Sequence, residues 1–214
     1  MSAVSAGLMA VMLSAGVRAE SPVALTVRLY NTAGIPTPEL AAARNAAASI
    51  LREIWPDVAF RHCGRPVSPD VAAHPRTGAP SAPDRPIDPC ADTLKPSEVV
   101  VRVINAPAFN ATLHPDAYGV TYVVHETNRG WLATVFPDRI GQASARVGVD
   151  RGTLLGLVMA HEVGHLLLGS RYHGDTGLMV AEWPDELLAR KSEQWRFTTF
   201  EAARMRRAFE SIGG

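Results

Sequence analysis

The sequence has little of what would indicate a nucleic-acid-binding protein or a membrane protein. Its 214 residues carry 21 basic and 21 acidic side chains, so the formal net charge is zero. Nothing in that balance favours nucleic acid or an anionic membrane as a partner. Hydrophobic residues make up 47% and charged residues 20%, which is ordinary for a soluble protein. The length suits one domain with a sizeable core.

The N-terminal apolar run is short. It extends from Val4 to Val17, and it is too short and too rich in Ala, Ser and Gly for a membrane span. The small-x-small pattern ending at Ala19 is a cleavage site before Glu20, although no Lys or Arg precedes the run. The sequence therefore predicts a signal peptide over residues 1–19 and no stable membrane insertion after its removal.

Cysteine is scarce as well, because the chain holds only Cys63 and Cys90. In an oxidising compartment two such residues can pair and close the loop between them. That loop lies in a Pro-rich stretch, predicted as a surface loop over residues 63–96, whose side chains offer little to bury. We therefore predict a Cys63–Cys90 disulfide, worth about 3 kcal/mol in the chain-entropy model.

What the chain does have is a regular succession of strand and helix patterns. Alternating or apolar segments predict five strands, at 23–31, 57–63, 97–105, 117–126 and 130–140. Helical patterns follow at 37–54, with Thr37 as N-cap and Pro38 at N1, and at 151–169, 184–191 and 200–212, the last capped by Thr198 or Thr199. This order predicts one α+β domain over residues 20–214. It consists of a mixed twisted sheet of about five strands, a packing helix, a long active-site helix and a small helical C-terminal part.

The most informative stretch is HEVGH, residues 161–165, within the apolar segment LLGLVMAHEVGHLLLG. His161 and His165 are four residues apart, so on a helix they share one face and both imidazoles can reach one zinc ion. Glu162 points to the side, where its carboxylate can take a proton from a zinc-activated water. A buried stripe rarely tolerates two His and a Glu without partners, which favours zinc binding over a chance match.

Catalytic zinc usually has three protein ligands, so a further residue must complete the site. Gly169 is a natural helix C-cap, where the chain turns back, and His173 four residues later is the leading candidate. Asp175 is the nearest rival, since carboxylates also bind zinc. Glu182 or Glu186 would serve if the third ligand came from a following helix.

The string HEVGHLLLGSRYH resembles the signature H-E-x-x-H-x-x-G-x-x-H of the metzincin metalloproteases, with the Gly one residue late and the third His two residues late. Met179 falls six residues after His173, a place suited to the Met-turn that packs beneath the zinc in that family. The resemblance implies a mixed sheet whose antiparallel edge strand, here YGVTYVVHE, binds the substrate peptide by strand addition. The chain is also similar to uncharacterised exported bacterial proteins with strings of the type AHEIGHLLLGS…H…GIM.

Three other residues each allow two interpretations. The segment RHCGRP around Cys63 looks like the cysteine switch PRCGxP of latent matrix metalloproteases, but a strand and a helix already precede it, which favours the disulfide. Tyr172 beside the third His is a candidate oxyanion stabiliser, although a Tyr at a helix exit is more often packed or exposed. Trp183 is expected in the core, where it could also form the wall of a substrate pocket.

Together these features predict a metalloendopeptidase, a zinc-dependent hydrolase acting on a peptide or protein substrate. His161, His165 and His173 hold the zinc, and Glu162 acts as the general base. The alternative is a zinc-stabilised binding module of the same fold whose site is catalytically restricted or inactive. A purely structural zinc site is less favoured, because such sites usually have four ligands rich in Cys. We expect a secreted or periplasmic monomer.

Overall fold

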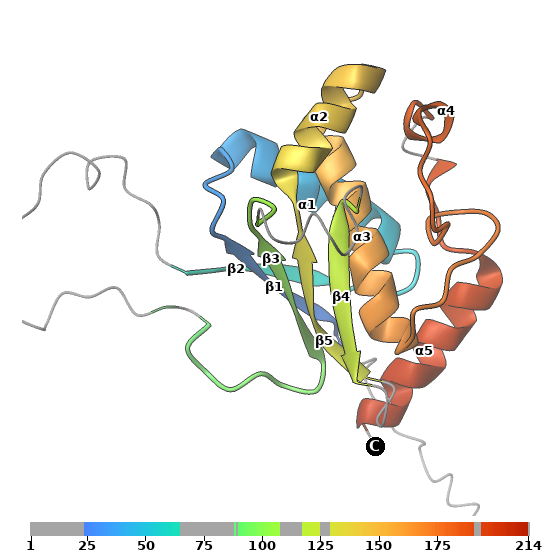
Figure 1. Cartoon of the computed structure of the whole chain (residues 1–214). Coiled ribbons are helices and arrows are strands. Elements are labelled where there is room, and N and C mark those ends of the chain that lie inside the picture. Colours follow the sequence, from blue (N-terminus) through green and yellow to red (C-terminus); the bar gives the residue numbers. More distant parts are fainter. Residues whose placement is uncertain are drawn as a thin grey trace, which may run out of the picture.

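The computed structural model describes residues 24–64, 88, 90–107, 117–124, 129–190 and 194–213. These residues form one five-stranded sheet and five helices around a single hydrophobic cluster. The α+β prediction is therefore confirmed (Figure 1). The predicted signal peptide over residues 1–19 and most of the predicted Pro-rich loop lie outside the described residues.

The sheet is mixed, with the strand order β2-β1-β3-β5-β4. β1 (Thr26–Asn31) pairs in parallel with β2 (Ala59–Cys63) and with β3 (Glu98–Val103), and β3 pairs in parallel with β5 (Arg129–Val135). β4 (Gly119–Val124) is antiparallel to β5 and lies at the edge of the sheet. The sheet therefore contains the antiparallel edge strand that the resemblance to metzincins implies.

One face of the sheet carries the core. Alternate side chains of the central strands are fully or almost fully buried there: Val27, Leu29, Val99, Val101, Val103, Ala133 and Val135. Two helices cover this face, α1 (Thr37–Leu51) and α3 (Arg151–Leu168), and they lie against each other (Figure 1). The period-two pattern that predicted the strands thus also decides which face the helices pack against.

α1 and α3 approach closely because α3 has glycine at two contact positions. A Cβ on Gly156 would overlap the carbonyl of Ala43, and one on Gly152 would lie 2.8 Å from the carbonyl oxygen of Glu39. Nine residues, or two and a half helical turns, separate Gly152 from His161 and Gly156 from His165. The two glycines therefore lie on the face of α3 opposite the two histidines.

A disulfide and a buried ion pair stabilise the other face of the sheet near β2. The predicted disulfide between Cys63 and Cys90 is present. Beside it, the buried guanidinium of Arg28 donates to the carbonyls of Cys90, Asp92 and Thr93 and pairs with the buried carboxylate of Glu98. This network fixes the chain that leads from Cys90 into β3.

Two local predictions are wrong, both near a proline. The last strand ends at Val135, and α2 (Pro137–Val147) follows where the sequence reading continued the strand to residue 140. Pro137 starts the helix, as proline commonly does, and left-handed Gly148 ends it. At α1, Thr37 is the first helical residue and Pro36 is the N-cap, so Thr37 does not cap the helix.

The C-terminal part contains a short helix α4 (Asp185–Leu188) and a longer helix α5 (Thr199–Gly213), as predicted. Thr198 caps α5, because its hydroxyl accepts from the N–H of Glu201 while the carboxylate of Glu201 accepts from the N–H of Thr198. Within the described residues, no helix has the length and apolar character that crossing a membrane requires.

Candidate metal centre

α3 presents the two histidines of the HEVGH stretch. The helix begins where the carboxylate of Asp150 accepts a hydrogen bond of 2.7 Å from the N–H of Thr153. It ends at Gly169, which adopts the left-handed conformation with a φ of 61°. The predicted C-cap is confirmed. The 18-residue helix thus carries His161 and His165 in its last two turns.

The tautomers of these two histidines follow from their hydrogen bonds. Nδ1 of His161 lies 2.8 Å from the carbonyl oxygen of Leu178, and Nδ1 of His165 lies 3.2 Å from the carbonyl oxygen of Ser170. A carbonyl can only accept, so each Nδ1 carries the proton and each Nε2 presents a lone pair. The two Nε2 atoms face each other at 3.1 Å, an arrangement that a metal ion bound to both nitrogens would satisfy.

His173 completes the cluster from the chain that follows Gly169. The candidate ligand nitrogens of His161, His165 and His173 all lie within 4.8 Å of one another. The ring of His173 packs edge-on to that of His165, with centroids 4.7 Å apart, and stacks beside that of His161. The late spacing of the third His is therefore accommodated by the turn after α3.

The geometry suits a tetrahedral metal ion. Two nitrogens bound to zinc at about 2.0–2.1 Å in tetrahedral geometry are separated by about 3.3 Å. The observed 3.1 Å between the Nε2 atoms of His161 and His165 is close to that separation. Both Nδ1–H groups donate to backbone carbonyls, and hydrogen bonds of this kind fix the orientation of metal-binding imidazoles. These residues can hold a metal ion.

Burial keeps all three imidazoles in the neutral form that binds metals. It lowers the pKa of His161 to about 4, although the carbonyl of Leu178 opposes the shift. Burial and the neighbouring imidazoles lower the pKa of His165 to about 3. Burial also lowers the pKa of the more exposed His173. The lone pairs are thus available for coordination at neutral pH.

Glu162 lies beside the cluster and contacts the edge strand β4. Its Oε2 accepts a hydrogen bond of 2.6 Å from the hydroxyl of Thr121. Burial raises the pKa of Glu162 to about 7, against the opposing effect of the Thr121 hydrogen bond. A carboxyl group with a pKa in this range can accept and release a proton near neutral pH, as a general base must.

Met179 and Trp183 lie next to the cluster. Met179 is fully buried, and its sulfur is so close to α3 that a Cβ on Gly164 would lie 2.6 Å from it. The ring of Trp183 packs edge-on to His161 at 5.4 Å, and its Nε1 donates to the carbonyl of Val180. The placement of Met179 against the helix backbone beside His165 agrees with the predicted Met-turn, whose role stays a prediction.

The rival ligands do not join the cluster. Asp175, Glu182 and Glu186 are exposed, and among the described residues the metal-competent group consists of His161, His165 and His173. The ring of Tyr172 packs against α5, where it meets the ring of Phe200 and the guanidinium of Arg204. Its suggested oxyanion role stays a prediction.

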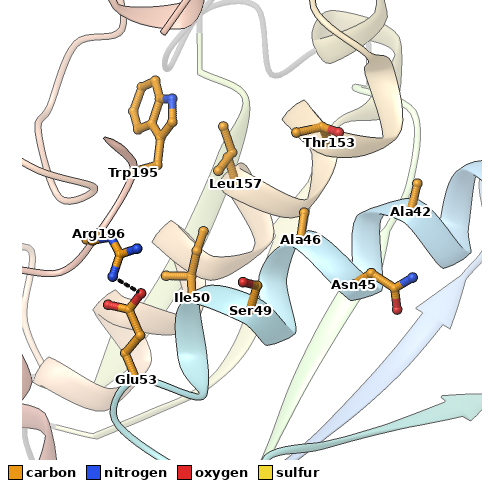
Figure 2. A pocket seen from close by; sticks show the side chains of 10 residues that line it. All are labelled: Ala42, Asn45, Ala46, Ser49, Ile50, Glu53, Thr153, Leu157, Trp195 and Arg196. Atoms are coloured by element: carbon orange, nitrogen blue, oxygen red, sulfur yellow. Dashed lines mark ion pairs between the residues drawn. The ribbon is translucent and has the colours of Figure 1, made fainter. Parts of the chain in front are cut away.

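A separate pocket of about 340 Å³ lies between α1, α3 and the segment 195–196. Figure 2 shows Leu157 and Trp195 on its upper side and the Glu53–Arg196 ion pair at one end. None of the three clustered histidines lines it. Trp195 packs against Trp183 at 4.5 Å, and Trp183 in turn contacts the ring of His161.

Three features of the site are not predicted from the sequence. They are the hydroxyl of Thr121, the carbonyl of Leu178 and the glycine at position 119, where a side chain would meet Glu162. A Cβ on Gly119 would lie 2.6 to 2.8 Å from the carboxylate and Cγ of Glu162. All three depend on how β4 and the 170–183 segment pack on α3, so no local pattern reveals them. The antiparallel edge strand implied by the metzincin resemblance was the one available hint.

Comparison with known proteins found no matching family model and no matching curated protein.

Proposed function

We propose that the protein is a zinc-dependent metallopeptidase. The observation that carries the proposal is the pair of Nε2 lone pairs from His161 and His165 facing each other at 3.1 Å, with His173 alongside. Zinc suits this all-imidazole donor set, although other first-row metals also bind imidazole. Three protein ligands leave a coordination position for water or substrate, which distinguishes a catalytic from a structural zinc site.

Zinc in this position would supply Lewis-acid polarisation of the scissile carbonyl and would lower the pKa of water towards about 7. The chain's own contribution is proton transfer. Glu162 removes a proton from the attacking water and delivers it to the leaving amine. The resemblance of HEVGHLLLGSRYH to the metzincin signature supports the same assignment.

The substrate is an extended peptide. Within the described residues, β4 has a strand neighbour on one side only. The backbone groups of its outer edge are suited to pairing with an extended segment by strand addition. Thr121 of the same strand contacts Glu162, so a peptide paired with β4 would run close to the proposed base.

Export accompanies this function. The Cys63–Cys90 disulfide favours an oxidising compartment, which supports a secreted or periplasmic location. N-terminal sequencing of the mature protein from culture medium and periplasm tests this part. A mature N-terminus at Glu20 is expected, and a cytoplasmic chain that retains residue 1 contradicts it.

The decisive experiment uses the zinc-loaded protein and a broad peptide library. We expect cleavage that chelators abolish and added zinc restores. Glu162→Gln should lower the rate by at least about 100-fold while the zinc content and the fold remain. If the zinc-loaded protein cleaves no peptide, the alternative of a zinc-stabilised binding module is favoured. If cleavage survives Glu162→Gln, Glu162 is not the base.

A further inference from the structure

Thr121 connects the sheet edge to the side chain of Glu162. Its hydroxyl lies 2.6 Å from Oε2 of Glu162 and 3.1 Å from the backbone oxygen of the same residue. One hydroxyl proton can serve only one of these acceptors fully, and the shorter distance identifies the carboxylate as its acceptor. Thr121 pairs with the fully buried Ala133 in β5, which places its side chain on the face that α3 covers.

Gly119 confines the same carboxylate from a second direction. A Cβ at Gly119 would lie 2.6 Å from Oε1, 2.7 Å from Cγ and 2.8 Å from Cδ of Glu162. Gly119 and Thr121 are two residues apart on one strand, so they occupy the same face of β4. Glu162 therefore lies against the strand because one position has no side chain and the other has a hydroxyl.

We propose that Thr121 and Gly119 are positioning residues that hold Glu162 in place for proton transfer. This inference rests on the proposed function, because it takes Glu162 as the base. Glu162 is 6% exposed, and a buried carboxylate without its hydrogen bond moves to another partner or admits water. A general base works only within about 2.6–3.2 Å of the group whose proton it takes. The rate of proton transfer therefore depends on where the Glu162 carboxylate is held.

The arrangement also links substrate binding to the base. β4 is the strand that offers its edge to an extended peptide, and Thr121 belongs to that strand. A shift of β4 along α3 would displace the Glu162 carboxylate and the bound peptide together. The strand therefore keeps the scissile bond and the base in a constant relation, which a base held only by α3 would not ensure.

Thr121→Val tests the inference, because valine keeps the shape and removes the hydroxyl. We expect kcat and kcat/KM to fall by the same factor, about 100-fold, with zinc affinity and thermal stability close to wild type. Thr121→Ser retains the hydroxyl and should restore most of the activity. Thr26→Val makes the same replacement on β1 and should leave activity unchanged. Gly119→Ala should lower kcat as Thr121→Val does.

Crystal structures of the zinc-loaded variants provide a readout that does not need activity. The Glu162 carboxylate should leave β4 in Thr121→Val and return in Thr121→Ser. If wild type cleaves no peptide, the proposed function fails, and the position of Glu162 in these structures alone decides the positioning role. An unmoved carboxylate in Thr121→Val overturns the inference. A loss of activity that Thr121→Ser does not rescue, or that follows loss of zinc, also overturns it.

Discussion

The Nε2 atoms of His161 and His165 lie 3.1 Å apart, while each ring donates its Nδ1 proton to a backbone carbonyl. The two rings therefore face each other through lone pairs, which repel unless a cation lies between them. The carbonyls belong to Leu178 and Ser170, on the segment that also carries His173. The same segment thus supplies the third imidazole and fixes the tautomers of the first two.

The first prediction concerns the third ligand. His173→Ala should weaken zinc binding by more than about 100-fold, since even residues that only hydrogen-bond to a ligand are worth about 10- to 100-fold. Asp175→Ala is the matched control, because Asp175 is exposed, two residues away and not part of the histidine cluster. It should keep stoichiometric zinc. Metal content after dialysis and chelator competition provide the measurement. Full zinc retention in His173→Ala would show that His173 is not a ligand.

The second prediction concerns the buried pair of Arg28 and Glu98. Burial alone raises the pKa of Glu98, but the backbone N–H of Lys95 and the guanidinium of Arg28 outweigh it and hold the pKa below its usual range. A carboxylate with a lowered folded-state pKa stabilises the fold above its unfolded pKa, about 4.3. That contribution disappears as the pH falls through the lower folded-state pKa.

Glu98→Gln should therefore lower the free energy of unfolding by about 3 kcal/mol at pH 7, because it removes the buried carboxylate that pairs with Arg28 and leaves that guanidinium only the half-exposed carboxylate of Asp92. The difference in unfolding free energy between wild type and Glu98→Gln should shrink as the pH falls below about 4.3. Denaturant titrations from pH 7 to pH 3 measure it. Glu53→Gln removes the exposed pair with Arg196 and should cost less than about 1 kcal/mol. A pH-independent gap for Glu98→Gln would contradict the assignment.

The third prediction concerns the disulfide. Replacing Cys63 and Cys90 together by serine should lower the free energy of unfolding by about 3 kcal/mol, because the bond closes a loop with a sequence separation of 27 residues. Wild type unfolded in the presence of a reductant should match the double variant. The bond joins the end of β2 to the chain before β3. β2 lies at the opposite edge of the sheet from β4, so zinc affinity should not change. Loss of zinc in the double variant would contradict this separation.

The fourth prediction concerns the contact between α1 and α3. Gly156→Ala should destabilise the protein by about 1–3 kcal/mol, because the added Cβ overlaps the carbonyl of Ala43. Helix propensity alone predicts the opposite sign, a gain of about 1 kcal/mol. Gly141→Ala in α2 is the control, since its Cβ meets only the side chain of Arg151, at 3.1 Å or more. Thermal and chemical unfolding distinguish the two. A stabilised Gly156→Ala would contradict the close approach.

The sequence predicts local structure correctly where a single residue type or spacing determines it. The four-residue spacing of His161 and His165 and the C-cap at Gly169 needed no tertiary information, and the structure has both as predicted. The five strands and their succession along the chain were also accessible, because the segments are short, apolar and separated by turns. These features depend on the periodicity and on the backbone preferences of single residues.

The predictions are wrong where a strand pattern and a helix pattern adjoin in the sequence. Residues 130–140 begin as a β-rich run and continue into a helix, and Pro137 marks the change. Reading Pro137 as a helix start and Gly148 as its end would have identified α2. The contact between Thr121 and Glu162 spans 41 residues, and it depends on the packing of β4 on α3. No local pattern contains that information.

Gly152 and Gly156 bring α1 against the face of α3 that lies opposite His161 and His165. The helix that carries these two histidines is therefore fixed by direct contact with a neighbouring backbone. His173 is on the chain beyond Gly169, outside that contact. In the proposed metal centre, ions of different radius would consequently not be accommodated by movement of α3. The adjustment would fall to His173, so the chain between Gly169 and Met179 would set which ionic sizes the centre accepts.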